Sequence, residues 1–252
     1  MTAADALDWD YTRLASTYDL RADYHAGLVE QTLQRLGLPP GAWALEVGAG
    51  TGKLTGLLCG HGLQVLASEP NTSMRTVALA KPALRRAQWL ACRGEALPLA
   101  AGAVRLVAYG SSFNVLPAQQ ALDECARVLA PGGYWLALWN HRDLDDPLQR
   151  EVEALIRHHL PGYDYGQRRV SPQDSVMGHG AFSHIDAAEQ RFVVEVDADD
   201  WMMAWKSHAT LQRQAGTRLP YILQDIRSLV ATSSALRIPY FTRLWTAQRK
   251  PL

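Results

Sequence analysis

Short apolar runs alternate with amphipathic stretches between Trp43 and Trp139. Runs of this length with few polar interruptions are typical of parallel strands covered by helices on both faces. Strands are predicted at Ala42–Val47, Leu63–Ser68, Arg86–Ala91, Val104–Tyr109 and Tyr134–Trp139, and helices at Lys53–Cys59, Thr72–Ala80 and Ala118–Leu129. Ala130-Pro131-Gly132-Gly133 ends the last helix. The alternation predicts a doubly wound α/β sheet, in which ligands bind at the carboxyl ends of the strands.

The flanking segments predict helices before this core and a mixture of helices and strands after it. Helices are expected at Tyr11–Leu20, Ala26–Leu36, Asp146–His159, Asp199–Ser207 and Tyr221–Val230, strands at Gln190–Val196 and Tyr240–Arg249, and a loop at Gly162–Gly180. We therefore expect a single domain with a mostly parallel, seven-stranded sheet. Its parts are a helical cap in residues 1–40, a core in 41–145, a helical lid with a late strand in 146–235 and a closing strand in 236–252.

The composition indicates a globular protein and bears on its partners and location. Of 252 residues, 48% are hydrophobic and 20% charged, which is typical of a globular chain. The 25 Lys and Arg balance the 25 Asp and Glu, which argues against nucleic acid and favours a small-molecule partner. No apolar run approaches the roughly 18 residues of a membrane span, so we expect no membrane partner and a cytoplasmic location. The three cysteines predict reduced thiols, and the oligomeric state stays open between monomer and homodimer.

The most informative segment is the glycine-rich turn Leu45-Glu46-Val47-Gly48-Ala49-Gly50-Thr51-Gly52-Lys53. It follows a predicted buried strand and opens a helix, so its backbone can approach a ligand closely. The dinucleotide fingerprint would need glycine where Lys53 stands, and the NTPase phosphate loop would need a longer glycine spacing and Ser or Thr where Leu54 stands. What remains is an acid two residues before a G-x-G-x-G turn, which suits a ligand with an ammonium or sulfonium group.

Glu46–Gly52 resembles motif I of the class I S-adenosylmethionine-dependent methyltransferases, of the small-molecule, type 11-like kind. Further segments resemble the same family: Ala15–Arg21, Glu69-Pro70 after the second strand, Arg93–Leu99 and Ala126–Gly133. Glu95 and Arg105 depart from it, because the family commonly has Asp at both positions. The resemblance covers roughly residues 10–140. It implies a Rossmann-like methyltransferase fold with S-adenosylmethionine as cofactor and S-adenosylhomocysteine as product.

The resemblance also implies residue roles. Glu69 would accept the ribose hydroxyls, Glu95 would read the adenine edge and Tyr18 would close over the methionine end. Met74 would pack on adenine, although packing within its own helix explains it equally well. The full set of implied cofactor residues is Tyr18, Glu46, Gly48, Ala49, Gly50, Thr51, Gly52, Glu69, Pro70, Met74, Gly94, Glu95, Ala96 and Ser111.

Candidates for the acceptor side lie in the cap, after the later strands and in the lid. His141 follows the fifth strand and is the candidate general base, with a structural loop histidine as the alternative. The expected substrate-lining residues are Tyr11, Arg21, His25, Phe113, Asn114, Asn140, Trp201 and Trp205. Trp201, Trp205 and His208 have the spacing of one helix face, which fits a pocket or simply core packing, and His25 fits an exposed helix position. The remaining histidines lack metal-ligand spacing, so no metal is expected.

These observations predict methyl transfer from S-adenosylmethionine to an O, N or C nucleophile of a small metabolite or natural product, as in secondary metabolism. Two alternatives stay open: a non-methylating reaction on the same fold, and a cofactor-binding subunit without chemistry. A nucleic-acid methyltransferase is disfavoured by the neutral charge and by the absence of an Asn/Asp-Pro-Pro-Tyr/Phe segment after the fourth strand. A hydrolase is disfavoured because no G-x-S-x-G turn is present.

Overall fold

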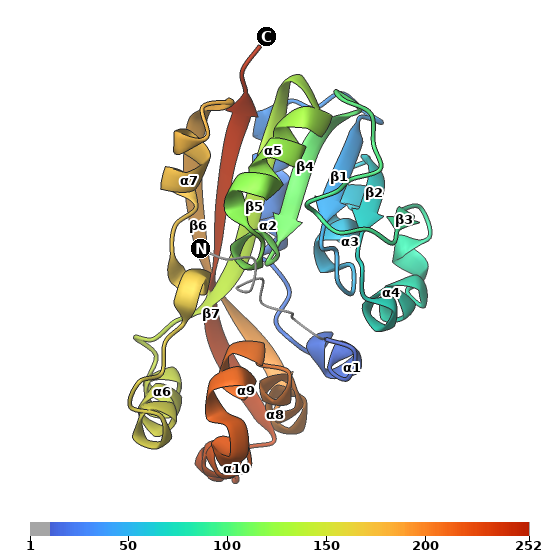
Figure 1. The fold of residues 1–252 in the computed structure, drawn as a ribbon. Helices are drawn as coiled ribbons and strands as arrows, with labels where there is room; N and C mark the ends of the chain where they lie inside the picture. The colour runs from blue at the N-terminus through green and yellow to red at the C-terminus, as the bar shows by residue number, and fades with distance from the viewer. Residues whose placement is uncertain (1–10, 252) are drawn as a thin grey trace.

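One seven-stranded sheet runs through the computed structural model, which describes residues 11–251 (Figure 1). The first ten residues of the predicted cap lie outside the described chain. The strand order is β3-β2-β1-β4-β5-β7-β6. The strands are β1 (Trp43–Val47), β2 (Gln64–Ser68), β3 (Gln88–Leu90), β4 (Val104–Gly110), β5 (Leu129–Arg142), β6 (Phe182–Asp197) and β7 (Ala235–Arg249). β1 to β5 are parallel, whereas β7 runs antiparallel to both β5 and β6. The predicted doubly wound, mostly parallel fold is confirmed.

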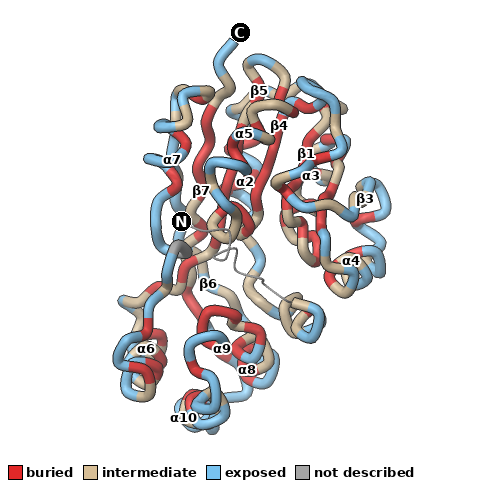
Figure 2. Tube along the Cα trace, in the orientation of Figure 1, coloured by how far each residue is buried: buried red, intermediate tan, exposed pale blue. Residues whose placement is uncertain are grey.

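Helices cover both faces of the sheet because its central strands are apolar on both sides. In β4, Val107 and Tyr109 pack on the side of α5 (Ala118–Val128) and α7 (Gln173–Gly178). Leu106 and Ala108 pack on the opposite side, with α2 (Ala26–Leu36) and α3 (Lys53–Gly60). Figure 2 shows the buried positions concentrated in these central strands. The strand order reverses between β1 and β4, so a crevice for ligands is expected at the carboxyl ends of these two strands.

The segment predicted as the lid, residues 146–235, packs around a separate hydrophobic core beyond the carboxyl ends of the parallel strands. β5 pairs with β7 only as far as Arg142 and Tyr240, whereas β6 and β7 continue pairing to Asp197 and Ala235. Around this extension lie α6 (Pro147–His159), α8 (Ala198–Lys206), α9 (Ala209–Ala215) and α10 (Leu219–Leu229), as Figure 1 shows. The short helix α1 (Ala15–Tyr18) contacts both α4 (Thr72–Leu79) and α8. It therefore bridges the core and the lid.

Several predicted elements differ in length from the observed ones. The helix expected at Tyr11–Leu20 is reduced to Ala15–Tyr18, which has no capping side chain. β6 starts at Phe182, well before the predicted Gln190, because its first half is held by pairing with β7 and not by an alternating apolar pattern. The segment predicted as a loop contains α7, and α9 was not predicted. No helix among residues 11–251 is long and apolar enough to cross a membrane.

Candidate active site

The glycine turn after β1 has a backbone that only glycine adopts easily. Gly48, Gly50 and Gly52 have φ values of 68°, 57° and 83°, in the left-handed region. A Cβ on Gly48 would also lie 2.7 Å from Cβ of Ser112, whereas a Cβ on Gly50 would meet nothing within 4 Å. The turn therefore packs tightly against its neighbours at Gly48 and is open to space at Gly50.

The Glu69 carboxylate holds this turn from the end of β2. Its Oε2 accepts the Gly50 N–H at 2.9 Å, and its Oε1 accepts the Asn71 N–H at 2.8 Å. The residue is only 8% exposed, and burial raises the pKa of its carboxyl group while the two amides lower it. Each carboxylate oxygen keeps a lone pair beyond these bonds, so it can accept a further hydrogen bond from a ligand hydroxyl.

A cavity of about 400 Å³ lies over the turn. Nine of the expected cofactor residues line it: Tyr18, Gly48, Gly50, Glu69, Pro70, Met74, Gly94, Glu95 and Ser111. Five expected residues do not: Glu46, Ala49, Thr51, Gly52 and Ala96. Gly52 instead precedes α3 and packs against Leu84. Tyr11, expected on the acceptor side, lines this cavity.

Eight residues of the cavity wall were not predicted: Val47, Asn71, Arg93, Gly110, Ser112, Val115, Leu116 and Pro117. Asn71 was detectable, since an Asn before a helical pattern is an N-cap signal, and its side chain accepts the Met74 N–H at 3.1 Å. The stretch from Val115 to Pro117 carries no comparable local signal.

Glu46 is buried behind Gly110, a residue of the cavity wall. Its Oε2 accepts a hydrogen bond from Thr55 Oγ1 at 2.5 Å, and a Cβ on Gly110 would lie 3.2 Å from its Oε1. Burial raises the pKa of the Glu46 carboxyl to about 8, and the negative charge of Glu69 adds to the effect. A cationic ligand group near Gly110 would favour the ionised form.

A second, smaller cavity of about 140 Å³ lies between the core, the cap and the lid. It shares Tyr18 and Ser111 with the first cavity. Six expected residues line it: Arg21, Asn114, Asn140, His141, Trp201 and Trp205. His208, considered above as a pocket residue together with Trp201 and Trp205, also lines it. The other wall residues, which were not predicted there, are Ala22, Tyr24, Lys53, Trp139, Arg142, Tyr165, Arg169, Ala204 and Tyr240.

Ser111 stands at the junction of the two cavities in a strained conformation. Its φ is 57°, which is unusual for a residue with a side chain. Its N–H donates to the Leu138 carbonyl at 2.8 Å, and its Oγ accepts from the Tyr24 hydroxyl at 3.0 Å. These two hydrogen bonds fix the wall between the cavities.

The lid aromatics belong to both the lid core and the cavity wall. Trp201 and Trp205 are 4% and 5% exposed, with ring centroids 5.9 Å apart. His208 is not on the same helix, because α8 ends at Lys206. It is the N-cap of α9, where its Nδ1 accepts the Leu211 N–H, and its ring stacks on Trp205 at 5.2 Å.

Two expected acceptor-side residues lie outside both cavities. His25 is the N-cap of α2, and its Nδ1 accepts the Leu28 N–H at 3.0 Å. Phe113 is 4% exposed and packs edge-on against Tyr109 and Trp135, each at 5.2 Å. Helix capping accounts for the first residue and core packing for the second.

Comparison with known proteins matches residues 45–137 to the model of the methyltransferase domain family. This segment is a class I methyltransferase domain. An uncharacterized methyltransferase of Mycobacterium tuberculosis is 39% identical to the chain over 112 residues, which are 44% of this chain and 45% of that protein. The match thus spans less than half of that relative's length.

Solved structures share the fold of the whole described chain. The YcgJ protein of Bacillus subtilis has a TM-score of 0.57 at 15% identity, with 90% of this chain and 98% of that chain covered. Phosphoethanolamine N-methyltransferase 2 of Haemonchus contortus, solved with phosphomonomethylethanolamine and S-adenosylhomocysteine, has a TM-score of 0.54 at 16% identity, with 100% of this chain and 61% of that chain covered. At these identities the comparison concerns the fold alone.

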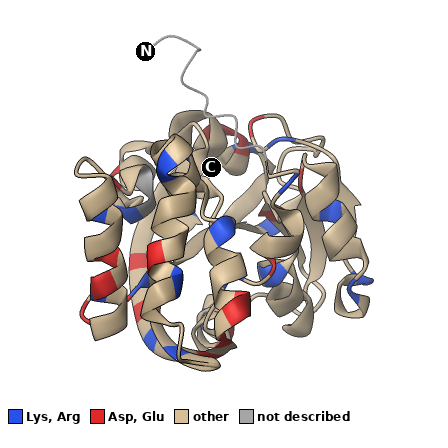
Figure 3. Ribbon diagram, turned by 90° about the horizontal axis from the view of Figure 1, so that it is seen from below, with Lys and Arg blue, Asp and Glu red and all other residues tan. Residues whose placement is uncertain are grey.

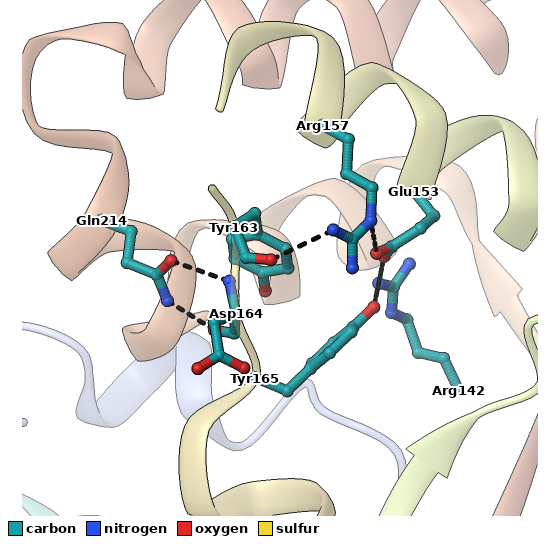
Figure 4. Close-up of polar contacts among 7 residues, drawn as sticks. All are labelled: Arg142, Glu153, Arg157, Tyr163, Asp164, Tyr165 and Gln214. Atoms are coloured by element: carbon teal, nitrogen blue, oxygen red, sulfur yellow. Dashed lines mark hydrogen bonds and ion pairs between the residues drawn. The ribbon is translucent and has the colours of Figure 1, made fainter. Parts of the chain in front are cut away.

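Polar contacts join the end of β5 to α6 and to the loop that follows α6 (Figure 4). Arg142, at the end of β5, donates to Glu153 of α6 and to the Tyr165 hydroxyl, each at 2.7 Å. The Tyr165 hydroxyl and Arg157 also contact the Glu153 carboxylate. Burial raises the pKa of Glu153, but the hydrogen bonds from Tyr165 and Arg142 and the positive charges of Arg142 and Arg157 lower it, and the net change is downward.

Among residues 11–251, no three His, Cys, Asp or Glu side chains are grouped so that they could hold a metal ion.

Proposed function

We propose that the chain transfers the methyl group of S-adenosylmethionine to an O, N or C nucleophile of a small-molecule acceptor. The observation that carries this proposal is the pair of cavities that meet at Tyr18 and Ser111. One cavity lies over the glycine turn of a methyltransferase domain, and the other is walled by aromatic side chains of the lid. We further propose a cytoplasmic enzyme, monomeric or homodimeric, without nucleic-acid or membrane partners.

The residues around the larger cavity fit the cofactor. The Glu69 carboxylate lies on the wall and can accept the two ribose hydroxyls, as a carboxylate does for a diol. The open space above Gly50 leaves room for the ligand to approach the backbone. Glu46, whose Oε1 would lie 3.2 Å from a Cβ on Gly110, could compensate an ammonium group held beside Gly110. When bound, the cofactor supplies a methyl group activated by a sulfonium.

The chain's own contribution is to hold the acceptor next to the junction and to keep water away. Methyl transfer is an in-line displacement, so alignment of the two reactants accounts for much of the rate acceleration. Trp139, Trp201 and Trp205 give the acceptor cavity an apolar wall that excludes water. His141, 7% exposed on the same wall, can accept a proton from an acceptor that carries one at neutral pH.

Calorimetric titration with S-adenosylhomocysteine tests the cofactor assignment. Wild type is expected to bind, and Glu69→Ala is expected to bind about 2–4 kcal/mol more weakly because charge-assisted hydrogen bonds are lost. Glu69→Gln keeps the size of the side chain but only one acceptor oxygen, so it can accept the Gly50 amide or the Asn71 amide but not both. The free energy of unfolding of both variants, measured alongside, separates loss of ligand contacts from collapse of the turn.

Glu151→Ala is the matched control, since it removes an exposed carboxylate from α6. Its affinity is expected to equal that of wild type. Absence of binding by the wild-type protein at millimolar ligand would refute the proposal. Binding without transfer of a labelled methyl group to any acceptor would favour the cofactor-binding subunit.

A further inference from the structure

The walls of the acceptor cavity carry an unbalanced charge. The described residues that line it include four cationic side chains, Arg21, Lys53, Arg142 and Arg169, and no carboxylate. Acidic and basic positions are otherwise intermixed over the lid and the core when the molecule is viewed from the lid end (Figure 3), and the whole chain is neutral. The positive lining is therefore a local property of this cavity.

Two of these cations have carboxylate partners that do not line the cavity. Lys53 Nζ lies 2.5 Å from Asp23, and Arg142 lies 2.7 Å from Glu153. The other two are placed on aromatic rings instead: Arg21 over Tyr18 at 5.0 Å and Arg169 over Tyr165 at 4.1 Å. Neither Arg21 nor Arg169 forms an ion pair with any carboxylate of the described residues.

Three guanidinium groups, those of Arg142, Arg157 and Arg169, lie near Glu153, and Arg169 is the one without an ion pair to it. This single carboxylate contacts both Arg142 and Arg157, at 2.7 and 2.8 Å. Arg169 is close enough to these groups for its pKa to be affected. Loss of hydration and the positive charge of Arg142 lower it, Tyr165 and the negative charge of Glu153 raise it, and the net change is downward. A bound anion would offset this repulsion between guanidinium groups.

We propose that the methyl acceptor carries an oxyanion, a carboxylate or a phosphate, on an aromatic body, and that Arg169 and Arg21 bind the oxyanion. The guanidinium fork matches both oxyanions in geometry. The aromatic body would pack among Tyr165, Trp201 and Trp205, which line the same cavity. This inference rests on the proposed function, because it names the substrate class of that same site.

Binding of matched probes to the protein saturated with S-adenosylhomocysteine tests this inference. The probes are 4-hydroxybenzoate, its neutral isostere 4-hydroxybenzamide and phenyl phosphate, each titrated to 10 mM and followed by ligand-observed NMR. We expect 4-hydroxybenzoate or phenyl phosphate to bind about 10-fold or more tightly than the amide. The stronger of the two identifies the oxyanion.

Arg169→Gln is expected to abolish this preference, and Arg169→Lys to retain part of it, because the charge remains while the fork is lost. Arg157→Gln is the matched control: it removes a cation from the same Glu153 cluster, but Arg157 does not line the cavity. Arg157→Gln should still bind the anionic probe more tightly than the amide. A wild-type protein that binds the amide as well as the anions, or binds none of the three probes, overturns the inference.

Titration with S-adenosylhomocysteine shows whether a negative result contradicts the oxyanion inference alone or the proposed function as well. Arg169 does not line the cofactor cavity, so Arg169→Gln should bind S-adenosylhomocysteine with wild-type affinity. If wild type does not bind S-adenosylhomocysteine, the proposed function fails; if it binds and shows no preference for the anionic probes, only the present inference fails.

Discussion

Glu46→Gln should stabilise the ligand-free protein at neutral and alkaline pH. The carboxyl group is 1% exposed and accepts one hydrogen bond from Thr55. Burial, together with the charge of Glu69, raises its pKa from an ordinary value of 4.5 to about 8. At about 1.4 kcal/mol for each pH unit, ionised Glu46 is disfavoured in the folded protein by roughly 5 kcal/mol relative to the unfolded chain.

The sign of the pH dependence follows from the number of bound protons. Between pH 4.5 and about 8 the folded protein keeps a proton on Glu46 that the unfolded chain has lost. The free energy of unfolding therefore falls as the pH rises through this window. Gln has nearly the same shape, still accepts the Thr55 hydroxyl and cannot ionise. The variant should gain stability over wild type progressively from pH 4.5 to 8, by about 3–5 kcal/mol at the upper end.

Urea unfolding of both proteins without ligand at pH 5, 6, 7 and 8 measures this difference. Glu151→Gln serves as control, since Glu151 is an exposed carboxyl on α6 and its removal should leave the pH dependence unchanged. Parallel stability curves for wild type and Glu46→Gln would refute the reasoning, because they would mean that Glu46 is ionised in the folded protein. The same variant should bind S-adenosylhomocysteine more weakly than wild type if Glu46 compensates the ammonium group.

Two further predictions concern the turn and the acceptor cavity. Gly48→Ala should lower the free energy of unfolding by about 2–4 kcal/mol, because alanine is strained at a φ of 68° and its Cβ would overlap Ser112. Chemical denaturation beside Gly60→Ala checks this, since Gly60 lies in α3 with open space around it, and an equal effect of both changes would contradict the prediction. His141→Ala should slow methyl transfer at unchanged affinity for S-adenosylhomocysteine, because His141 lines only the acceptor cavity. A wild-type turnover rate would assign His141 a structural role.

The parts predicted most accurately are those with local chemical signals. α2 spans the predicted Ala26–Leu36 and ends at Gly37, which has a φ of 59°. α6 follows the Asp146 N-cap, whose side chain accepts the Gln149 N–H. The glycine turn was found for the same reason: its unusual backbone requires glycine at fixed spacing.

The acceptor cavity was predicted only in part because long-range contacts assemble it. Arg142 and Tyr165 come from the end of β5 and from a loop, and neither position has a periodicity that marks it. Their joint contact with Glu153 exists only once α6 has packed beside the end of β5. Likewise, the first half of β6 is an edge strand with exposed residues on both faces, so its pairing with β7 leaves no alternating pattern to recognise.

The two cavities are built by different parts of the chain. Short segments that follow consecutive strands of the core build the cofactor wall, whereas the acceptor wall needs the β6–β7 extension and the lid helices that pack around it. The two walls share Tyr18 and Ser111, and Ser111 is fixed by hydrogen bonds from the core and the cap, not from the lid. If the proposed function holds, substitutions among lid residues of the cavity wall would change which acceptor binds while the Ser111 side of the junction is kept. Of the four cations on that wall, Lys53 and Arg142 belong to the core, whereas Arg21 and Arg169, which we propose bind the oxyanion, belong to the cap and to residues 146–235.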